Sequence, residues 1–412
     1  MVNAYPIAFA ALILSAGALG DRIGSRRVFI AGFAIFTAAS LACAAAPTLA
    51  ILIGARLIQG IGAAVLVPNS LALLNHAHPD PEQRQHAVAI WAAGASLALT
   101  AGPLVGGALI ALSGWRSIFL VNVPIGLIGL WLTVRYAQET ERAPAQRLDL
   151  VGQSCAMLAL TCLAAAMIEG GRLGWADRRV AGGFVAAVVL LAAFIRVEQR
   201  SQHPMLPLGL FSSAEFSIAS VAGLLVNIAF YGMIFVFSLY FQRLQRYSPL
   251  QTGLAFVPMS GAILIANLIA SRATAIAGPR AIIALGTAIS AVGSLALLPI
   301  TAGSSYLSML VPLIVMGAGL DLLVPPLTAT MLGSVAKGQS GIASGVLNSM
   351  RQSGSVLGVA LLGSLVAQQS TFLPGMRSAL VVAAAALAAA CAAVLAGIPG
   401  YKGSKTKQDQ RT

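Results

Sequence analysis

Long apolar segments recur along almost the whole chain of 412 residues. A helix needs about 20 mostly apolar residues to cross the hydrocarbon core of a bilayer. The segments are rich in Gly, Ala and Leu and lack the strict alternation of membrane β-strands. They predict an all-α, polytopic protein of the cell inner membrane. The thirteen predicted membrane helices cover residues 4–20, 28–46, 49–74, 87–112, 116–136, 150–169, 179–197, 214–241, 250–271, 279–300, 304–332, 341–367 and 376–397.

The scarcity of charge excludes most soluble classes of protein. Only 9% of the residues are charged, whereas a soluble domain carries about 25%, so hydrated side chains cannot cover a globule of this size. The hydrophobic content of 58% equally excludes intrinsic disorder. The formal net charge of +13 then indicates basic loops on the cytoplasmic side of a membrane, and we expect no nucleic-acid partner.

The basic residues also orient the predicted helices. When the linker at 21–27 is placed on the cytoplasmic side, most Lys and Arg residues of the other linkers fall on that side too. This distribution follows the positive-inside rule. The orientation puts the C-terminus in the cytoplasm and Met1 outside.

Two long polar linkers divide the chain. Residues 137–149 and 198–213 bracket a central pair of apolar segments, with five segments before the pair and six after it. The predicted units are a five-helix N-terminal bundle at 1–136, two central linker helices with flanking cytoplasmic loops at 137–213, a six-helix C-terminal bundle at 214–398 and a basic cytoplasmic tail at 399–412.

The first cytoplasmic turn carries an ordered set of Gly, Asp and Arg residues. A glycine on the preceding helix lets a neighbouring helix approach closely, and the second glycine allows a tight reversal of the chain. The carboxylate is placed to accept hydrogen bonds from a facing helix N-terminus or to pair with arginine, and the last two arginines suit anionic headgroups. A basic loop alone needs no such order. We predict a conformational gating motif made of Gly17, Asp21, Arg22, Gly24, Arg26 and Arg27.

An arginine lies about two turns inside the apolar segment 49–74. Arg56 is followed on this segment by Gln59, Gly60 and Gly62. A charge at this depth is costly and is functional by default, so we assign Arg56 to proton coupling and Gln59 to a substrate cavity. The alternative is a structural arginine bonded to backbone carbonyl groups.

Small residues recur at every fourth position along segment 87–112, which gives one helix face a smooth ridge for close packing. A proline in their midst breaks the hydrogen-bond ladder and allows a bend. Close packing explains the glycines but does not predict this proline. The residues of this motif are Gly94, Ala98, Gly102, Pro103, Gly106 and Gly107.

Asp321 is the only carboxylate deep inside an apolar segment. Loss of hydration favours the neutral form of a carboxyl group, and a proton carrier has to alternate between neutral and ionised forms. Arg351 lies on the next antiparallel segment, at a depth that differs by about one turn when each residue rises ~1.5 Å. Two interpretations follow. Asp321 and Arg351 couple protons or substrate to transport, or they form a static ion pair.

Two further segments carry polar or aromatic side chains that suit a cavity. Polar residues at 348, 351, 352 and 355 share one helix face, which has to point toward a cavity or a partner helix rather than lipid. A cavity with aromatic walls and few polar groups suits bulky amphipathic ligands. Ordinary helix packing is the alternative for any single aromatic residue. The predicted cavity residues are Gln59, Asn227, Tyr231, Asn348 and Gln352.

The remaining chemistry-bearing residues indicate no cofactor, metal site or enzyme. The four cysteines lie inside apolar segments and form no CxxC pair. His76, His78 and His86 occupy a polar linker without an acidic or Cys partner at metal-binding spacing, so we expect a solvated loop. No nucleotide-binding GxxxxGK[ST] motif occurs, and no nucleophile, base and orienting group cluster in the sequence.

The three motifs, in this order and spacing, resemble the major facilitator superfamily over nearly the whole chain. Gly102-Pro103 followed by Gly106-Gly107 is similar to the motif that this family associates with antiporters. The central pair of helices and the stretches 114–126 and 248–259 further resemble the fourteen-helix drug/proton antiporter branch (EmrB/QacA type). The resemblance implies two bundles that rock about a site near the membrane midplane.

This resemblance also implies the function. We expect proton-coupled efflux of hydrophobic or cationic drugs by alternating access. The implied partners are a drug-like small molecule, protons and the lipid bilayer, and a periplasmic adaptor is a further candidate.

One feature departs from the family pattern. The family has a helix before the loop motif, and Val2, Asn3, Ala4 and Tyr5 resemble the tail of that helix's motif. We therefore expect a missing first helix, which the external Met1 also indicates. Two alternatives stay open: a truncated membrane protein that does not transport, or a metabolite uptake carrier of the same fold. The Gly102-Pro103 motif argues against the uptake carrier.

Overall fold

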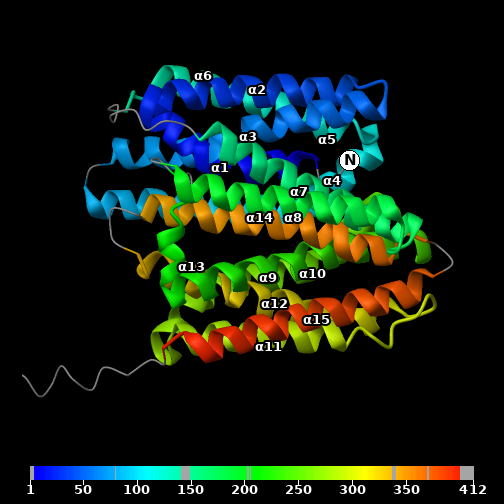
Figure 1. The fold of residues 1–412 in the computed structure, drawn as a ribbon. Coiled ribbons are helices and arrows are strands. Elements are labelled where there is room, and N and C mark those ends of the chain that lie inside the picture. Colours follow the sequence, from blue (N-terminus) through cyan, green and yellow to red (C-terminus); the bar gives the residue numbers. More distant parts are fainter. Residues whose placement is uncertain are drawn as a thin grey trace, which may run out of the picture.

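The computed structural model describes residues 4–78, 80–140, 149–201, 204, 206–335, 340–368 and 371–399. Val2, Asn3, most of the 137–149 linker and nearly all of the basic tail lie outside these residues. Every regular element within them is a helix (Figure 1). The elements are α1 (Ala4–Ile23), α2 (Ser25–Ala45), α3 (Leu49–Ala77), α4 (Pro81–Ser113), α5 (Ser117–Leu120), α6 (Asn122–Tyr136), α7 (Leu150–Leu173), α8 (Arg178–Arg200), η1 (Leu208–Ser212), α9 (Ala214–Leu239), η2 (Tyr240–Leu244), α10 (Pro249–Ala277), α11 (Pro279–Leu295), α12 (Tyr306–Leu322), α13 (Val324–Gly333), α14 (Ser340–Leu365) and α15 (Phe372–Gly397).

The all-α, polytopic prediction is confirmed. Each predicted membrane segment coincides with one helix or with two consecutive helices, although α11 ends at Leu295 and is shorter than predicted. Within the described residues, nine helical stretches are long and apolar enough to cross a membrane. Shorter apolar helices lie at Ala4–Ile13, Leu104–Ser113 and Pro279–Leu295.

The helices run roughly side by side in a stack (Figure 1). At one end of the stack, α3 packs against α1 and α2, and α6 packs against α2. At the other end, α9 packs against α14 and α15, while α11 packs against α12 and α15. Among the described residues, α1 packs against α14, and α4 packs against α10. Of the central pair, α7 packs against α1 and α14, and α8 packs against α7.

The buried apolar residues are distributed unevenly between the two groups. From α8 to α15, a single continuous cluster forms the core, in which Phe216, Phe237, Tyr240 and Phe241 are fully buried. Among the side chains that the structure describes, those of the N-terminal helices contribute to four smaller clusters. One of these clusters joins Ile7 of α1 to α7 and α14. The C-terminal group therefore has the better consolidated core.

Side-chain caps fix the ends of the central pair. The carboxylate of Asp149 accepts a hydrogen bond of 2.7 Å from the backbone N–H of Gly152 at the start of α7. Asp177 accepts one of 2.7 Å from the backbone N–H of Arg179 at the start of α8. Such caps satisfy N–H groups that have no partner within the helix. The two helices therefore start at defined positions.

Candidate functional site

Asp321 and Arg351 line the same cavity. The cavity has a volume of about 40 Å³ and lies where α9, α10, α12, α13 and α14 meet. Asn227 and Tyr231 of α9 line it too, so four of the sequence-predicted site residues lie together. A water molecule needs roughly 10–15 Å³ of such volume. In this conformation the cavity therefore has room for water but not for a drug molecule.

Asp321 and Arg351 do not touch as an ion pair. The ion pairs within the described residues are Arg27–Glu139 and Arg172–Glu169. Asp321 instead accepts a hydrogen bond from the side chain of Asn267 on α10 and feels the charge of Arg351 at longer range. Asn227 is buried and donates a hydrogen bond of 2.7 Å to the carbonyl oxygen of Gly223 on its own helix. The carboxyl group of Asp321 and the guanidinium of Arg351 therefore line one small cavity without forming a direct ion pair.

The other polar residues of α14 lie outside this cavity. Asn348 donates a hydrogen bond of 3.0 Å to the carbonyl oxygen of Ser344. Ser355 donates one of 2.8 Å to the carbonyl oxygen of Gln352. The sequence pattern placed Asn348 and Gln352 in a substrate cavity, whereas the structure places both half-buried on α14 with local hydrogen bonds.

Arg56 and Gln59 form a polar cluster between α2 and α3. Arg56 Nη1 donates a hydrogen bond of 2.5 Å to Gln59 Oε1. Gln59 Nε2 donates one of 2.7 Å to Ser40 Oγ, and Ser40 donates one of 2.7 Å to the carbonyl oxygen of Phe36. Gln59 is only 1% exposed. The amide of Gln59 thus links the Arg56 charge to α2.

Aromatic rings cover the charge of Arg56. The centre of its guanidinium lies 4.5 Å from the centroid of the Tyr5 ring and 5.7 Å from that of Phe119. Cation–π contacts of this kind are worth about 2 kcal/mol when they are shielded from water. Within the described residues, no carboxylate pairs with Arg56. The cluster of Arg56 and Gln59 is separate from the cavity of Asp321.

The turn between α1 and α2 is held by the segment that follows α6. The backbone N–H of Arg26 donates a hydrogen bond of 2.9 Å to Glu139 Oε1, and that of Ser25 donates one of 2.9 Å to Thr140 Oγ1. Arg27 Nε lies 3.6 Å from Glu139 Oε2. The carboxylate of Glu139 therefore caps the N-terminus of α2, where negative charge is favoured.

Glycines make this turn possible. Gly24 has a φ angle of +108°, and a Cβ atom there would meet the Glu139 carboxylate at 2.5 Å. Gly20 contacts the side chain of Asn69 on α3. That side chain also donates hydrogen bonds of 3.1 Å to the carbonyl oxygen of Ala16 and 2.8 Å to that of Val65. The turn is therefore packed tightly on both sides.

The other residues of the predicted gating motif are less constrained. A Cβ atom at Gly17 would lie 3.7 Å from Pro68, an ordinary contact distance. Arg22 is exposed, and Arg26 Nη2 donates a hydrogen bond of 2.8 Å to the carbonyl oxygen of Val134. The side chain of Asp21 lies outside the described residues.

The glycine ridge of α4 is open along most of its length. Within the described residues, a Cβ atom added at Gly94, Gly102 or Gly106 would meet no atom within 4 Å. One at Gly107 would meet the carbonyl oxygen of Pro249 at 2.6 Å, where α4 packs against α10. The side chain of Pro103 lies outside the described residues. Of the four glycines of this ridge, Gly107 is the one at which a Cβ atom would meet a described residue of the C-terminal helices.

Sequence reasoning missed Glu139, Asn69 and Asn267. Glu139 lies in a linker that we treated only as a polar connection. Asn69 and Asn267 are amides inside apolar helices. A buried amide has to find hydrogen-bond partners, and this requirement was the available signal. Asn69 bonds to Ala16 on α1 as well as to Val65 on its own helix, and Asp321 lies on a different helix from Asn267, so the sequence alone does not identify these contacts between helices.

Comparison with known proteins places the chain in a family. Residues 1–359 match the family described as the Major Facilitator Superfamily. The methylenomycin A resistance protein of Streptomyces coelicolor is 37% identical over 363 residues, which cover 88% of this chain and 76% of that protein. The protein of the same name from Bacillus subtilis is 33% identical over 409 residues, covering 99% and 88%. The multidrug resistance protein Stp of Mycobacterium tuberculosis is 37% identical over 367 residues, covering 89% and 68%.

Solved structures agree on the fold. The human organic anion transporter MFSD10 superposes with a TM-score of 0.61 at 16% identity, over 95% of this chain and 82% of that one. A POT family transporter, solved in complex with 5-aminolevulinic acid, superposes with a TM-score of 0.68 at 13% identity, over 95% and 86%. This chain therefore belongs to the major facilitator superfamily of multi-pass membrane transporters, as its three sequence motifs predict.

Proposed function

We propose that this protein exports hydrophobic or cationic drug molecules across the inner membrane in exchange for protons. Similar proteins carry the names of antibiotic resistance and multidrug resistance proteins. The observation that carries the proposal is the cavity in which Asp321 and Arg351 face the same small polar space. The partners in this proposal are a drug-like molecule, protons and the bilayer.

In this proposal Asp321 exchanges its proton during each transport cycle. A protonated carboxyl group is neutral and tolerates burial, whereas the ionised form needs a compensating positive charge. Arg351 or a cationic drug supplies that charge. The direct ion pair is absent, so either group is able to approach Asp321. Asn267 holds the carboxyl group in place meanwhile.

The movement in this proposal is a rocking of the N-terminal helices against the C-terminal helices. The contacts that have to change are those of α1 with α14 and of α4 with α10. The cavity of about 40 Å³ is too small for a drug, because pockets for drug-sized ligands measure roughly 300–1,000 Å³. Drug binding therefore requires a conformation in which these contacts have separated.

The proposal is tested by drug transport into everted membrane vesicles. An imposed inward-acidic pH gradient should drive uptake of ethidium by the parent chain, and Asp321→Asn should lower the rate about 100-fold, within the range of a lost proton-transfer group. Glu169→Gln is the matched control, because Glu169 lies at a helix end and pairs with the exposed Arg172. Membrane abundance of each variant is measured in parallel.

Three results would contradict the proposal. Gradient-driven transport by Asp321→Asn at the parent rate would exclude Asp321 as the proton carrier. Equal losses in Asp321→Asn and Glu169→Gln would show a general effect of removing a carboxylate. No transport by the parent chain at normal membrane abundance would favour the alternative, a membrane protein that does not transport.

A further inference from the structure

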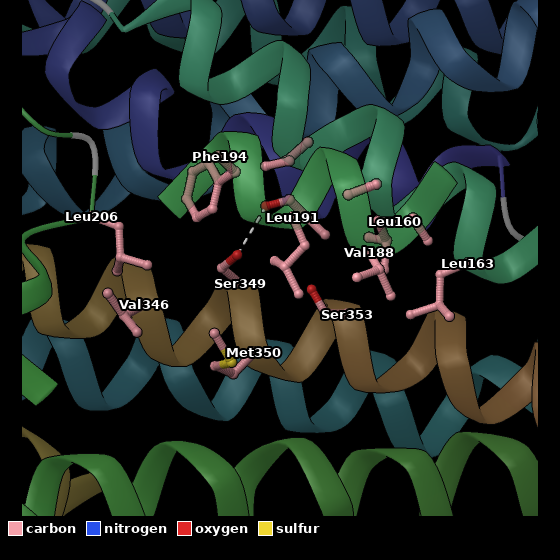
Figure 2. Close-up of a pocket in the computed structure, with 15 residues that line it drawn as sticks. Leu160, Leu163, Val188, Leu191, Phe194, Leu206, Val346, Ser349, Met350 and Ser353 are labelled. Atoms are coloured by element: carbon pink, nitrogen blue, oxygen red, sulfur yellow. Dashed lines mark hydrogen bonds between the residues drawn. The ribbon is translucent and has the colours of Figure 1, made fainter. Parts of the chain in front are cut away.

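A second cavity lies between the central pair and α14, away from Asp321. It has a volume of about 240 Å³. Its walls come from α1, α7, α8 and α14, together with Leu206 from the segment after α8 (Figure 2). Figure 2 shows Leu160, Val188 and Leu191 on one side of the space and the α14 residues Ser349 and Ser353 on the other. The cavity of Asp321 has a different set of walls.

The wall of this cavity is almost entirely apolar. Its lining consists of Ala, Leu, Val, Phe and Met side chains and two serines, and none of the lining residues is charged. Ser349 donates a hydrogen bond of 3.1 Å to the carbonyl oxygen of Ala10. Ser353 forms no hydrogen bond with any described residue, so its hydroxyl remains available. An apolar cavity of about 150 Å³ stays dry and binds benzene. This larger one has room for a guest of one or two rings.

The α8 wall of the cavity also reaches the surface of the helix bundle. Val188 and Leu191, which line it, are 66% and 51% exposed. The surface of α8 around them is apolar, since Val185 and Val189 are exposed too. In a bilayer such a surface faces hydrocarbon. Molecules that reach this opening are therefore those that dissolve in the interior of the membrane.

The chemistry of the wall selects against a phospholipid. Leu206, at one end of the cavity, donates its backbone N–H to Glu198 Oε2 at 3.0 Å. The lining offers no Lys or Arg to a phosphate group. We propose that this cavity is a binding site for a neutral, apolar molecule of one or two rings, which enters from the membrane beside α8 and lies against Ser353.

Binding at this site does not require the transport cycle proposed for Asp321. α14 separates the two cavities, with Met350 lining the apolar one and Arg351 lining the other. The test below measures binding alone. Absence of transport would therefore not contradict the binding site, and absence of binding would not contradict the proposed role of Asp321 as proton carrier.

Photolabelling tests this site. The purified full chain in lipid nanodiscs is irradiated with 3-(trifluoromethyl)-3-phenyldiazirine, a neutral apolar probe whose carbene inserts into nearby C–H bonds. Peptide mass spectrometry should find saturable adducts on Leu160, Leu163 and Met350. Naphthalene should displace them, whereas the cation tetraphenylphosphonium should not.

Two pairs of variants control for position. Ala159→Phe fills the cavity and should lower the saturable labelling about ten-fold, while Leu158→Phe, on the exposed face beside it, should not. If Ala159→Phe does not fold, Val188→Phe narrows the opening, and Val185→Phe is its exposed control.

Other labelling results would overturn the proposal. Labelling that rises without saturation, or that persists in Ala159→Phe and Val188→Phe, would overturn the proposal. A second arm uses phosphatidylglycerol with a diazirine in its acyl chain. Saturable adducts from this lipid that naphthalene fails to displace would identify a lipid chain as the occupant and would also overturn the proposal.

Discussion

At the scale of single residues, two amide side chains inside this protein connect neighbouring helices. Gln59 connects Arg56 to Ser40, and Asn267 connects α10 to Asp321. The sequence singled out Arg56 and Gln59 as polar residues of one apolar segment. It could not reveal Ser40, because nothing local distinguishes a serine that accepts a buried hydrogen bond from one that does not.

The relation between Asp321 and Arg351 is open to a double-mutant test. Arg351→Ala should lower transport strongly, because it leaves Asp321 without compensating charge. Asp321→Asn should restore part of the folded stability of that variant, by about 1–3 kcal/mol, if the two charges interact across the cavity. Thermal unfolding in detergent measures this coupling. Strictly additive effects would show that the charges do not interact.

Gln59 offers a second prediction at this scale. Gln59→Leu removes an acceptor from a charged donor, which is worth about 1.5–3 kcal/mol, so the melting temperature in detergent should fall. The same substitution in an Arg56→Met background should cost much less, because the donor is gone. Ser70→Ala, at a half-buried serine elsewhere on α3, serves as the control. An equal fall in melting temperature in both backgrounds would show that the hydrogen bond between Arg56 and Gln59 does not contribute to stability.

At the scale of elements, close helix crossings depend on glycine at particular positions. At Gly354 of α14, a Cβ atom would meet the carbonyl oxygen of Leu224 at 2.6 Å. At Gly102 of α4, a Cβ atom meets open space within the described residues. The sequence pattern predicted small residues for close packing on α4. This pattern does not show whether another helix packs against the small residues.

These two glycines should therefore respond differently to substitution. Gly354→Ala should destabilise the protein by about 1–3 kcal/mol through overpacking between α9 and α14, as measured by thermal unfolding. Gly102→Leu should leave stability unchanged but slow ethidium transport about ten-fold, because the open ridge has to receive a helix in another conformation. Unchanged transport by Gly102→Leu would mean that the ridge faces lipid throughout the cycle.

No local sequence pattern predicted the cap at the N-terminus of α2. Glu139 follows α6 and binds the N-terminus of α2, more than 100 residues earlier. Long-range pairing of this kind depends on tertiary structure, so the sequence offered only a polar linker. The glycine-rich turn itself was predictable, because the left-handed backbone of Gly24 leaves a sequence signature.

At the scale of the whole molecule, the buried side chains that the structure describes are grouped differently in the two sets of helices. The continuous cluster of the C-terminal group contrasts with the small clusters of the N-terminal helices. The apolar segments predicted the helices, and the three motifs indicated the family. Neither could predict this asymmetry, because it depends on how side chains from different helices meet.

This asymmetry predicts a difference in local stability. Backbone amides of α9 and α15 should exchange hydrogen about ten-fold or more slowly than those of α2 and α3, since opening a larger core costs more free energy. Hydrogen exchange with mass spectrometry, on the full chain in detergent, measures this difference. Equal protection of both groups would show that the small clusters are as cohesive as the large one.

The position of α14 as a shared wall has a mechanical consequence. Met350 and Arg351 are neighbours in the chain and project about 100° apart on a helix, one toward each cavity. A slight roll of α14 about its own axis therefore carries both side chains in the same sense. A hydrocarbon wedged beside Met350 would resist that roll, and so would hold the arginine still. An apolar ligand beside Met350 would thus block the movement of α14 without contacting Asp321.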